Sequence, residues 1–96
     1  MQRDRPVVVV SSPAFDVALL RIIVPLTTWR PEFADRINKL RIPVDDRNGL
    51  DAESAADFLQ VRSVSTERFI ERIGALDADQ VEEIVAGVVI AIDYPG

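Results

Sequence analysis

The chain has 96 residues, of which 48% are hydrophobic and 28% are charged, and its formal net charge at pH 7 is −5. This length allows one small domain, so we treat residues 1–96 as a single globular unit. Because the sequence contains no cysteine and no histidine, its composition excludes a disulfide framework, a zinc–thiolate centre, a thiol nucleophile and imidazole acid–base catalysis.

The first half of the chain predicts three short strands separated by loops. Residues 7–10 are all valine, which favours a central strand buried on both faces. This apolar run is too short for a signal peptide or a membrane span, so we expect a cytoplasmic protein with no membrane partner. A second strand is predicted over residues 18–24, and it is expected to stop near Pro25 because proline cannot donate to a sheet. Residues 27–35 are expected to form a loop, and residues 38–44 an edge strand.

The middle of the chain predicts turns and short elements. An Asn-Gly pair marks residues 45–49 as a turn, and residues 52–56 are expected to form one helical turn. Polar and apolar side chains alternate over residues 57–64, which predicts a strand. Residues 65–68 are predicted to be a short turn or the start of a helix, and residues 69–74 a further short strand.

The C-terminal segment carries a strong helix signal. Asp77 can cap the first turn while the Gln80 side chain reaches back to it, an arrangement known as a capping box. Gly87 lies within this helix and permits close packing. Apolar residues recur at helical spacing and predict one packing stripe, formed by Val81, Ile84, Val85, Val88 and Ile92. Strands followed by one terminal helix indicate an α+β fold with a curled antiparallel sheet.

Charge is distributed unevenly along the chain. Residues 1–48 contain eight basic and six acidic side chains, whereas residues 49–96 contain three basic and ten acidic ones. A polyanion would therefore meet the first half, although scattered solvated charges explain the pattern as simply. Lys39 and Arg41 alternate along the predicted edge strand, where basic side chains commonly protect an edge from pairing.

Several segments of the sequence, taken in order, resemble a known family. They are 5–11 (Arg-Pro-Val-Val-Val-Val-Ser), 24–28 (Val-Pro-Leu-Thr-Thr), Gly49-Leu50, 58–64 (Phe-Leu-Gln-Val-Arg-Ser-Val), Arg68 and 73–76 (Ile-Gly-Ala-Leu). Each segment is weak evidence by itself. Their coincidence in this order and spacing resembles the MazF/PemK toxins of bacterial type II toxin–antitoxin systems.

The resemblance implies a small SH3-like, partly closed antiparallel β-barrel with a C-terminal helix, the fold of MazF, PemK and CcdB-like toxins. It implies a metal-independent endoribonuclease, an mRNA interferase that cuts single-stranded RNA at short sequences by attack of the 2′-hydroxyl, with no cofactor. It further implies a homodimer and a cognate antitoxin that neutralises the toxin by occupying its RNA groove.

The sequence departs from the family in one respect. Family members carry an additional N-terminal strand and a flexible Gly-rich loop ahead of the Arg-Pro pair, whereas only four residues precede Arg5 here. The alternative is therefore a non-catalytic binding module of the same fold. Such a module would be either gyrase-inhibitor-like or a truncated toxin that only binds an antitoxin or a partner, and the acidic net charge favours it.

Two residues match the catalytic pair of the family. Arg5 matches the catalytic arginine, and its planar fork can hold two phosphate oxygens at once. A guanidinium is a poor base because its pKa exceeds about 12, so we expect it to stabilise transition-state charge. Thr27 matches the catalytic threonine, whose hydroxyl can donate to phosphate. The alternatives are an Arg5–Asp4 ion pair, a turn-capping role for Thr27, and Thr28 in the place of Thr27.

Further side chains are candidate RNA contacts. Ser11 and Thr28 follow strand ends and can touch phosphate, although Ser11 also suits a turn. Gln60 and Arg62 are expected to share one strand face, where they would read a base edge and a phosphate or form a solvated face. Trp29, followed by Phe33 in the same loop, can stack on unpaired bases, or the two rings can seal the barrel end or a dimer contact.

Overall fold

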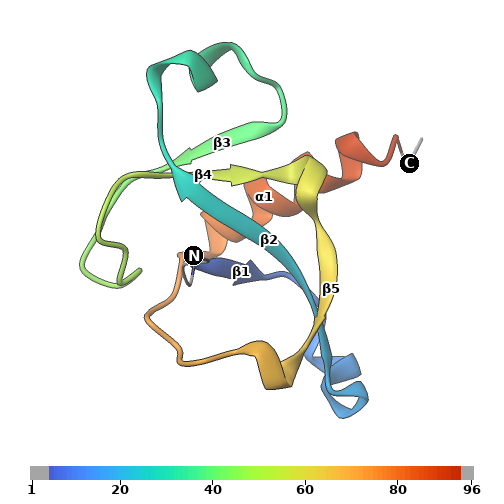
Figure 1. The fold of residues 1–96 in the computed structure, drawn as a ribbon. Helices are drawn as coiled ribbons and strands as arrows, with labels where there is room; N and C mark the ends of the chain where they lie inside the picture. The colour runs from blue at the N-terminus through green and yellow to red at the C-terminus, as the bar shows by residue number, and fades with distance from the viewer. Residues whose placement is uncertain (1–4, 94–96) are drawn as a thin grey trace.

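The computed structural model describes residues 5–93, and within them it contains five strands, four 3-10 helices and one α-helix (Figure 1). The strands are β1 (Val7–Val9), β2 (Leu20–Thr28), β3 (Lys39–Ile42), β4 (Ser54–Asp57) and β5 (Arg62–Ser65). The 3-10 helices are η1 (Pro13–Ala18), η2 (Pro31–Asp35), η3 (Phe58–Gln60) and η4 (Thr66–Arg68), and the α-helix is α1 (Ala78–Ala91).

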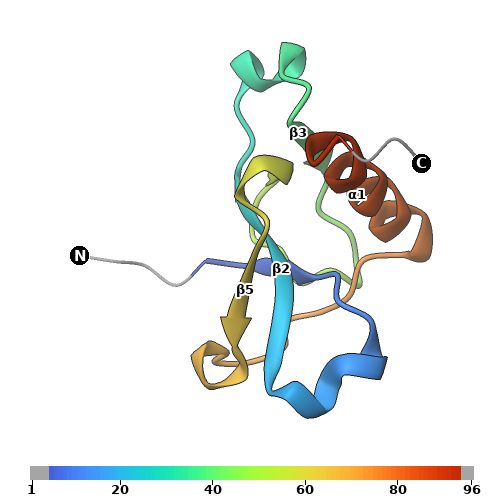
Figure 2. The same ribbon diagram turned by 90° about the vertical axis from the view of Figure 1, so that its right-hand side faces the viewer.

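The sheet is organised around β2, which is the longest strand. All pairs are antiparallel: β1 pairs with one edge of β2, while β5 and β4 pair with successive halves of the other edge, and β3 extends the sheet from β4. The sheet curls, but β3 and β5 do not pair within residues 5–93, so it is not closed. Figures 1 and 2 show α1 against one side of this sheet. The predicted α+β architecture with a terminal helix is confirmed.

Pro25 lies inside β2, so the predicted stop near this residue is wrong. The Leu26 N–H donates to the Pro6 carbonyl at 3.0 Å on the β1 side, and successive backbone N–H positions alternate between the two edges of a strand. The nitrogen of Pro25 therefore points to the other edge, where pairing with β5 has ended at Ile23 and pairing with β4 begins at Leu26. The missing donor falls in a gap in the ladder.

The region predicted as a helical turn followed by one strand is different in the structure. Residues 52–56 do not form a helical turn, because Ala55 and Ala56 are fully buried in β4 between β2 and β3. The alternating segment 57–64 is not one strand, because η3 interrupts it. Asp57 begins this interruption by accepting a hydrogen bond from the Leu59 N–H at 3.1 Å.

Other local predictions have mixed outcomes. The edge strand over 38–44 is confirmed as the shorter β3, the turn at 45–49 is present with a φ of 67° at Gly49, and 65–68 contains η4. The predicted strand at 69–74 is wrong. That segment is irregular, and its end contacts the turn through a 2.8 Å hydrogen bond from the Ala75 N–H to the Arg47 carbonyl.

The predicted bounds of the first two strands and of the following loop also change. β1 is an edge strand with Val9 45% exposed, not a strand buried on both faces, because within the described residues it pairs only with β2. The start of the predicted second strand, at Ala18, belongs to η1. Of the predicted loop 27–35, the first two residues complete β2 and the last five form η2.

The core lies between α1 and one face of the sheet. The capping box is confirmed, with the Gln80 N–H donating to the Asp77 carboxylate at 2.8 Å. Ile84 is fully buried against β2, β3 and β4, whereas Val85 and Ile92 are exposed, so the predicted stripe is only partly correct. Gly87 is essential to the close packing, because a Cβ there would come within 2.3 Å of the Phe58 ring.

Candidate functional site

Arg5 and Thr27 come together on the side of the sheet opposite α1. Val7 pairs with Pro25, and continuing this register places Arg5 opposite Thr27. The Arg5 Nη1 lies 3.5 Å from the Thr27 Oγ1, a long hydrogen bond between an exposed side chain and a half-buried one. No carboxylate of residues 5–93 lies within ion-pair distance of Arg5. The alternative partner Asp4 lies outside the described residues.

The row of side chains that starts at Arg5 continues across the sheet. Thr27 is opposite Ala55 on β4, and Ala55 is opposite Arg41 on β3. Directly opposed residues in antiparallel strands project to the same face. Arg5 and Arg41 therefore stand at the two ends of one row, with the Thr27 hydroxyl and the small Ala55 side chain between them. Phosphate oxygens near Thr27 would lie between two arginines.

Thr28 occupies a different position from Thr27. Successive side chains along a strand point to opposite faces, so Thr28 lies on the face that carries Leu26 and the core. It is exposed because β2 ends there. The hydrogen bond from Arg5 goes to Thr27, so the geometry favours Thr27 over Thr28 as the partner of the arginine.

Trp29 lies next to this row and is held from two sides. The backbone N–H of Trp29 donates to the Glu53 backbone carbonyl at 2.9 Å, which extends the β2–β4 register and places the Trp29 side chain on the same face as Thr27. The Arg41 guanidinium lies 5.2 Å from the centroid of the indole ring, within cation–π distance. Arg41 also binds Glu53 through a two-pronged ion pair, with its Nε at 2.7 Å and its Nη2 at 2.9 Å from the two carboxylate oxygens.

A second cation–carboxylate pair, Lys39 with Asp57, lies beside the Arg41–Glu53 pair and is largely buried from solvent. The Lys39 ammonium is 2.8 Å from the Asp57 carboxylate and 4.8 Å from the centroid of the Phe33 ring. Phe33 packs edge-on against Trp29 at a centroid distance of 5.8 Å. Burial acts to raise the pKa of Asp57, but hydrogen bonds from Lys39, Asn38 and the backbone together hold that pKa below its usual value. The aromatic pair thus joins the two ion pairs into one cluster.

Gln60 and Arg62 do not share a strand face. Gln60 belongs to η3, and its Nε2 donates to the Asp57 carboxylate at 3.2 Å. Arg62 is exposed on β5 opposite Ile23. Ile23 and Thr27 project to one face of β2 and are four residues apart, so Arg62 lies on the side of Thr27 at a distance of about 13 Å along the strand.

Ser11 is not brought to the Arg5–Thr27 pair. It follows β1 at the end remote from Arg5, which at the rise of an extended chain is about 20 Å away. Its hydroxyl is buried and has no hydrogen-bond partner among the described residues. In this conformation the Ser11 hydroxyl does not reach a phosphate bound at Thr27.

Arg41 and Glu53 are candidate functional residues that the sequence analysis did not identify. Arg41 was assigned to edge protection, and Glu53 was not considered. Both belong to the face defined by Thr27 only because β3 and β4 pair in the observed register. The alternation of Lys39 and Arg41 was a usable signal, since it predicted that both would lie on one face.

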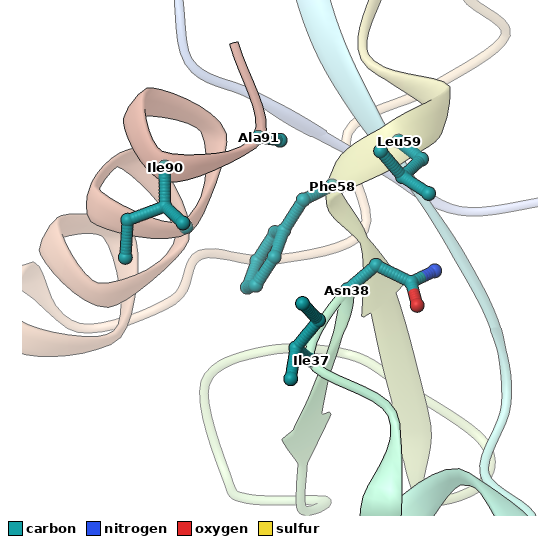
Figure 3. A pocket seen from close by; sticks show the side chains of 7 residues that line it. Ile37, Asn38, Phe58, Leu59, Ile90 and Ala91 are labelled. Atoms are coloured by element: carbon teal, nitrogen blue, oxygen red, sulfur yellow. The ribbon is translucent and has the colours of Figure 1, made fainter. Parts of the chain in front are cut away.

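The opposite side of the molecule carries an apolar pocket of about 230 Å³ between η3 and α1 (Figure 3). The Phe58 ring points toward α1 there, flanked by Ile37 and Ile90, both largely exposed. Along residues 5–93 no helix has the length and apolar character needed to span a membrane. Over the same residues, no three acidic side chains gather as a metal site would require.

Comparison with known proteins yields one family and a shared fold. The sequence matches the model of the PemK-like, MazF-like toxins of type II toxin–antitoxin systems over residues 1–92. The Mycobacterium tuberculosis toxin MazF-mt6 is similar in structure, with a TM-score of 0.74 and 21% identity over 93% of this chain and 86% of that chain. A crystal structure described as an Mtb toxin has a TM-score of 0.72 and 20% identity over 91% of each chain. No curated protein matches the sequence.

Proposed function

The chain belongs to the PemK-like, MazF-like family of type II toxin–antitoxin toxins, and we propose that it is a metal-independent endoribonuclease that cuts single-stranded RNA. The observation that carries this proposal is the pairing of Arg5 with Thr27 across two neighbouring strands, on the face of the sheet opposite α1. Both are the residues that the sequence resemblance assigns to catalysis, and they are separated by 22 positions in the chain.

The pair is suited to stabilising charge on a phosphate under attack. In the proposed reaction the 2′-oxygen forms a bond to phosphorus, the bond to the 5′-oxygen breaks, and the proton lost by the 2′-hydroxyl is balanced by one gained at the leaving oxygen. The products are a 2′,3′-cyclic phosphate and a 5′-hydroxyl. The Arg5 fork would hold the non-bridging oxygens, and the Thr27 hydroxyl would donate to one of them.

The RNA would cross the face that carries Thr27. Trp29 lies on this face beside Thr27 and would stack on an unpaired base, and the exposed Arg62 would contact a more distant phosphate. Gln60 is a weaker candidate for an RNA contact, because its side-chain amide already donates a hydrogen bond to Asp57. Ser11 and Thr28 also have weaker cases, since one hydroxyl is buried and the other side chain lies on the opposite face.

Two protein partners would use different surfaces: a second copy of the chain would bind at α1, and an antitoxin would bind the face that carries Thr27. A homodimer is supported by the unbroken apolar run over residues 84–92 of α1 and its cap, in which Val85, Val89 and Ile90 are exposed and Ile90 lines the pocket. Sedimentation at micromolar protein should give twice the mass of one chain, and a monomer would contradict the homodimer. A cognate antitoxin in the cytoplasm would neutralise the toxin by covering the Thr27 face.

The proposal is tested with purified protein and a long single-stranded RNA in the presence of EDTA. Wild-type protein should cut the RNA, and Arg5→Ala should cut about 10²–10³ times more slowly, the usual effect of removing one charge-stabilising donor. Arg72→Ala is the matched control, because Arg72 is an exposed arginine outside the proposed site. Intact RNA at high wild-type protein would overturn the proposal and leave a non-catalytic binding module of the same fold.

A further inference from the structure

Arg5 and Arg41 stand at the two ends of the row that contains Thr27, but they differ in their partners. Both belong to the row that crosses the sheet through Thr27 and Ala55. The side chain of Arg5 reaches the Thr27 hydroxyl. Arg41 is engaged by the Glu53 carboxylate through two hydrogen bonds in fork geometry. The site thus contains one arginine directed at its centre and a second one that holds a carboxylate.

The carboxylate on Arg41 has the geometry that a phosphate would adopt. A guanidinium binds carboxylates and phosphates in the same bidentate manner, through two parallel N–H groups. The Trp29 ring supports the guanidinium at 5.2 Å, so the ring can keep the guanidinium in place when the anion changes. A phosphate could therefore replace the carboxylate without rebuilding the site.

The Arg41–Glu53 pair is also accessible to exchange. The Arg41 side chain is 58% exposed and that of Glu53 is 37% exposed. Exposed ion pairs contribute little to folding because water and salt screen them. Glu53 is fixed through its backbone, whose carbonyl accepts the Trp29 N–H, whereas Arg41 is the side-chain partner found for its carboxylate. The Glu53 side chain can swing away while the strands stay paired.

From these observations we propose that Arg41 is a second phosphate-binding arginine of the Thr27 site, and that Glu53 competes with the RNA backbone for it. The inference rests on the proposed function for the identity of the ligand. Glu53 acts as a built-in anionic competitor that weakens RNA binding until a phosphate replaces it. RNA bound in this way places one phosphate on Arg5 and a neighbouring one on Arg41.

The test measures binding of a short, labelled 2′-O-methyl RNA of mixed sequence, which cannot be cut by a 2′-hydroxyl mechanism. Glu53→Gln should bind this probe about twofold to fivefold more tightly, the range spanned by exposed ion pairs. Arg41→Ala should bind more weakly, and its salt dependence should fall by about 0.7 in log–log slope for the lost phosphate contact. Arg41→Lys should recover only part of the affinity, since lysine lacks the fork.

The matched control for Glu53→Gln is Asp16→Asn. Asp16 also forms an ion pair with an arginine, Arg21, at 3.4 Å, and its replacement changes net charge by the same amount near the remote end of β2. The proposal is overturned if Asp16→Asn tightens binding as much as Glu53→Gln does. It is also overturned if the gain from Glu53→Gln persists in the Arg41→Ala background, because the gain is expected to act through Arg41.

The binding assay separates this inference from the endoribonuclease proposal. If no RNA is cut but Glu53→Gln still tightens binding through Arg41, the nuclease proposal fails and the Arg41 inference stands. If wild-type protein cuts RNA but binding of the probe is insensitive to both residues, the Arg41 inference fails and the nuclease proposal stands. Circular dichroism melting of each variant confirms that the compared proteins are folded.

Discussion

Two cation–carboxylate pairs on β3 are built alike but have different surroundings. Lys39 and Arg41 project from the same face two residues apart, each over an aromatic ring and each beside a carboxylate of the β4 segment. The Lys39 and Asp57 side chains are only 12% and 8% exposed, whereas those of Arg41 and Glu53 are 58% and 37% exposed. The comparison shows how burial turns one arrangement into a structural element and leaves the other available to a ligand.

The buried pair is also more richly bonded. The Asp57 carboxylate accepts hydrogen bonds from Asn38, Lys39, Gln60 and the Leu59 N–H, at 2.8 to 3.2 Å. These donors come from the start of β3 and from η3, so Asp57 fixes the point where β4 ends. Glu53 has no such set of donors among the described residues, where its carboxylate accepts hydrogen bonds only from Arg41.

The largest expected effect follows from breaking the buried pair. Asp57→Ala should lower the free energy of unfolding by about 3–5 kcal/mol, because it leaves the Lys39 charge buried without a partner. Urea denaturation measures this change. Glu53→Ala is the matched control and should leave the unfolding midpoint nearly unchanged. Equal shifts in the two variants would show that burial does not distinguish the pairs.

The two aromatic rings should differ in their roles in the same way, Trp29 acting in RNA binding and Phe33 in stability. Trp29→Ala should weaken RNA binding by about 1–3 kcal/mol, the usual contribution of a base-stacking aromatic, and fluorescence anisotropy measures it. Phe33→Ala should instead lower the free energy of unfolding by about 0.5–3 kcal/mol, because Phe33 covers the Lys39–Asp57 pair. A loss of RNA affinity in Phe33→Ala as large as in Trp29→Ala, with unchanged stability, would contradict this division.

The smallest expected effect is on the acid side of the stability profile. The pKa of Asp57 is lower in the folded chain, so below the usual aspartate pKa of about 3.9 the unfolded chain binds more protons. The stabilisation from Asp57 is therefore complete above that pH and is lost as the pH falls through the lowered pKa. Asp57→Asn should flatten the thermal midpoint profile between about pH 5 and pH 3. An unchanged profile would show that another carboxyl is responsible.

Parts of the fold with local signals were predictable from the sequence. The Asp77–Gln80 capping box, the Asn48-Gly49 turn and the edge position of β3 each depend on a few neighbouring residues, and all three are present. The passage of β2 through Pro25 was not predictable locally. It depends on β4 replacing β5 as the partner strand at that position, which is a property of the whole sheet.

The candidate site was predictable only in part, because some of its residues come together through strand pairing and not through local sequence. The sequence resemblance singled out Arg5 and Thr27, and the structure brings these two together. Gln60 and Arg62 do not share a strand face because η3 lies between β4 and β5. This helix begins where the Asp57 carboxylate accepts a hydrogen bond from the Leu59 N–H. The Arg41–Glu53 pair joins strands on either side of the 45–49 turn, so the register of β3 on β4 had to be known before the two could be placed together.

The central position of β2 bears on how the chain folds. The β1–β2 and β3–β4 pairs join segments that are near in sequence, whereas β2–β4 and β2–β5 join distant ones. We expect the docking of the β3–β4 pair and of β5 onto β2 to come late, because it closes long segments of chain, and such non-local closure slows folding relative to a helical protein of equal size. The amides of Val24 and Leu26 should exchange with deuterium only through global opening, since the loss of β2 would break its pairing with β1, β4 and β5 and leave β4 paired only with β3.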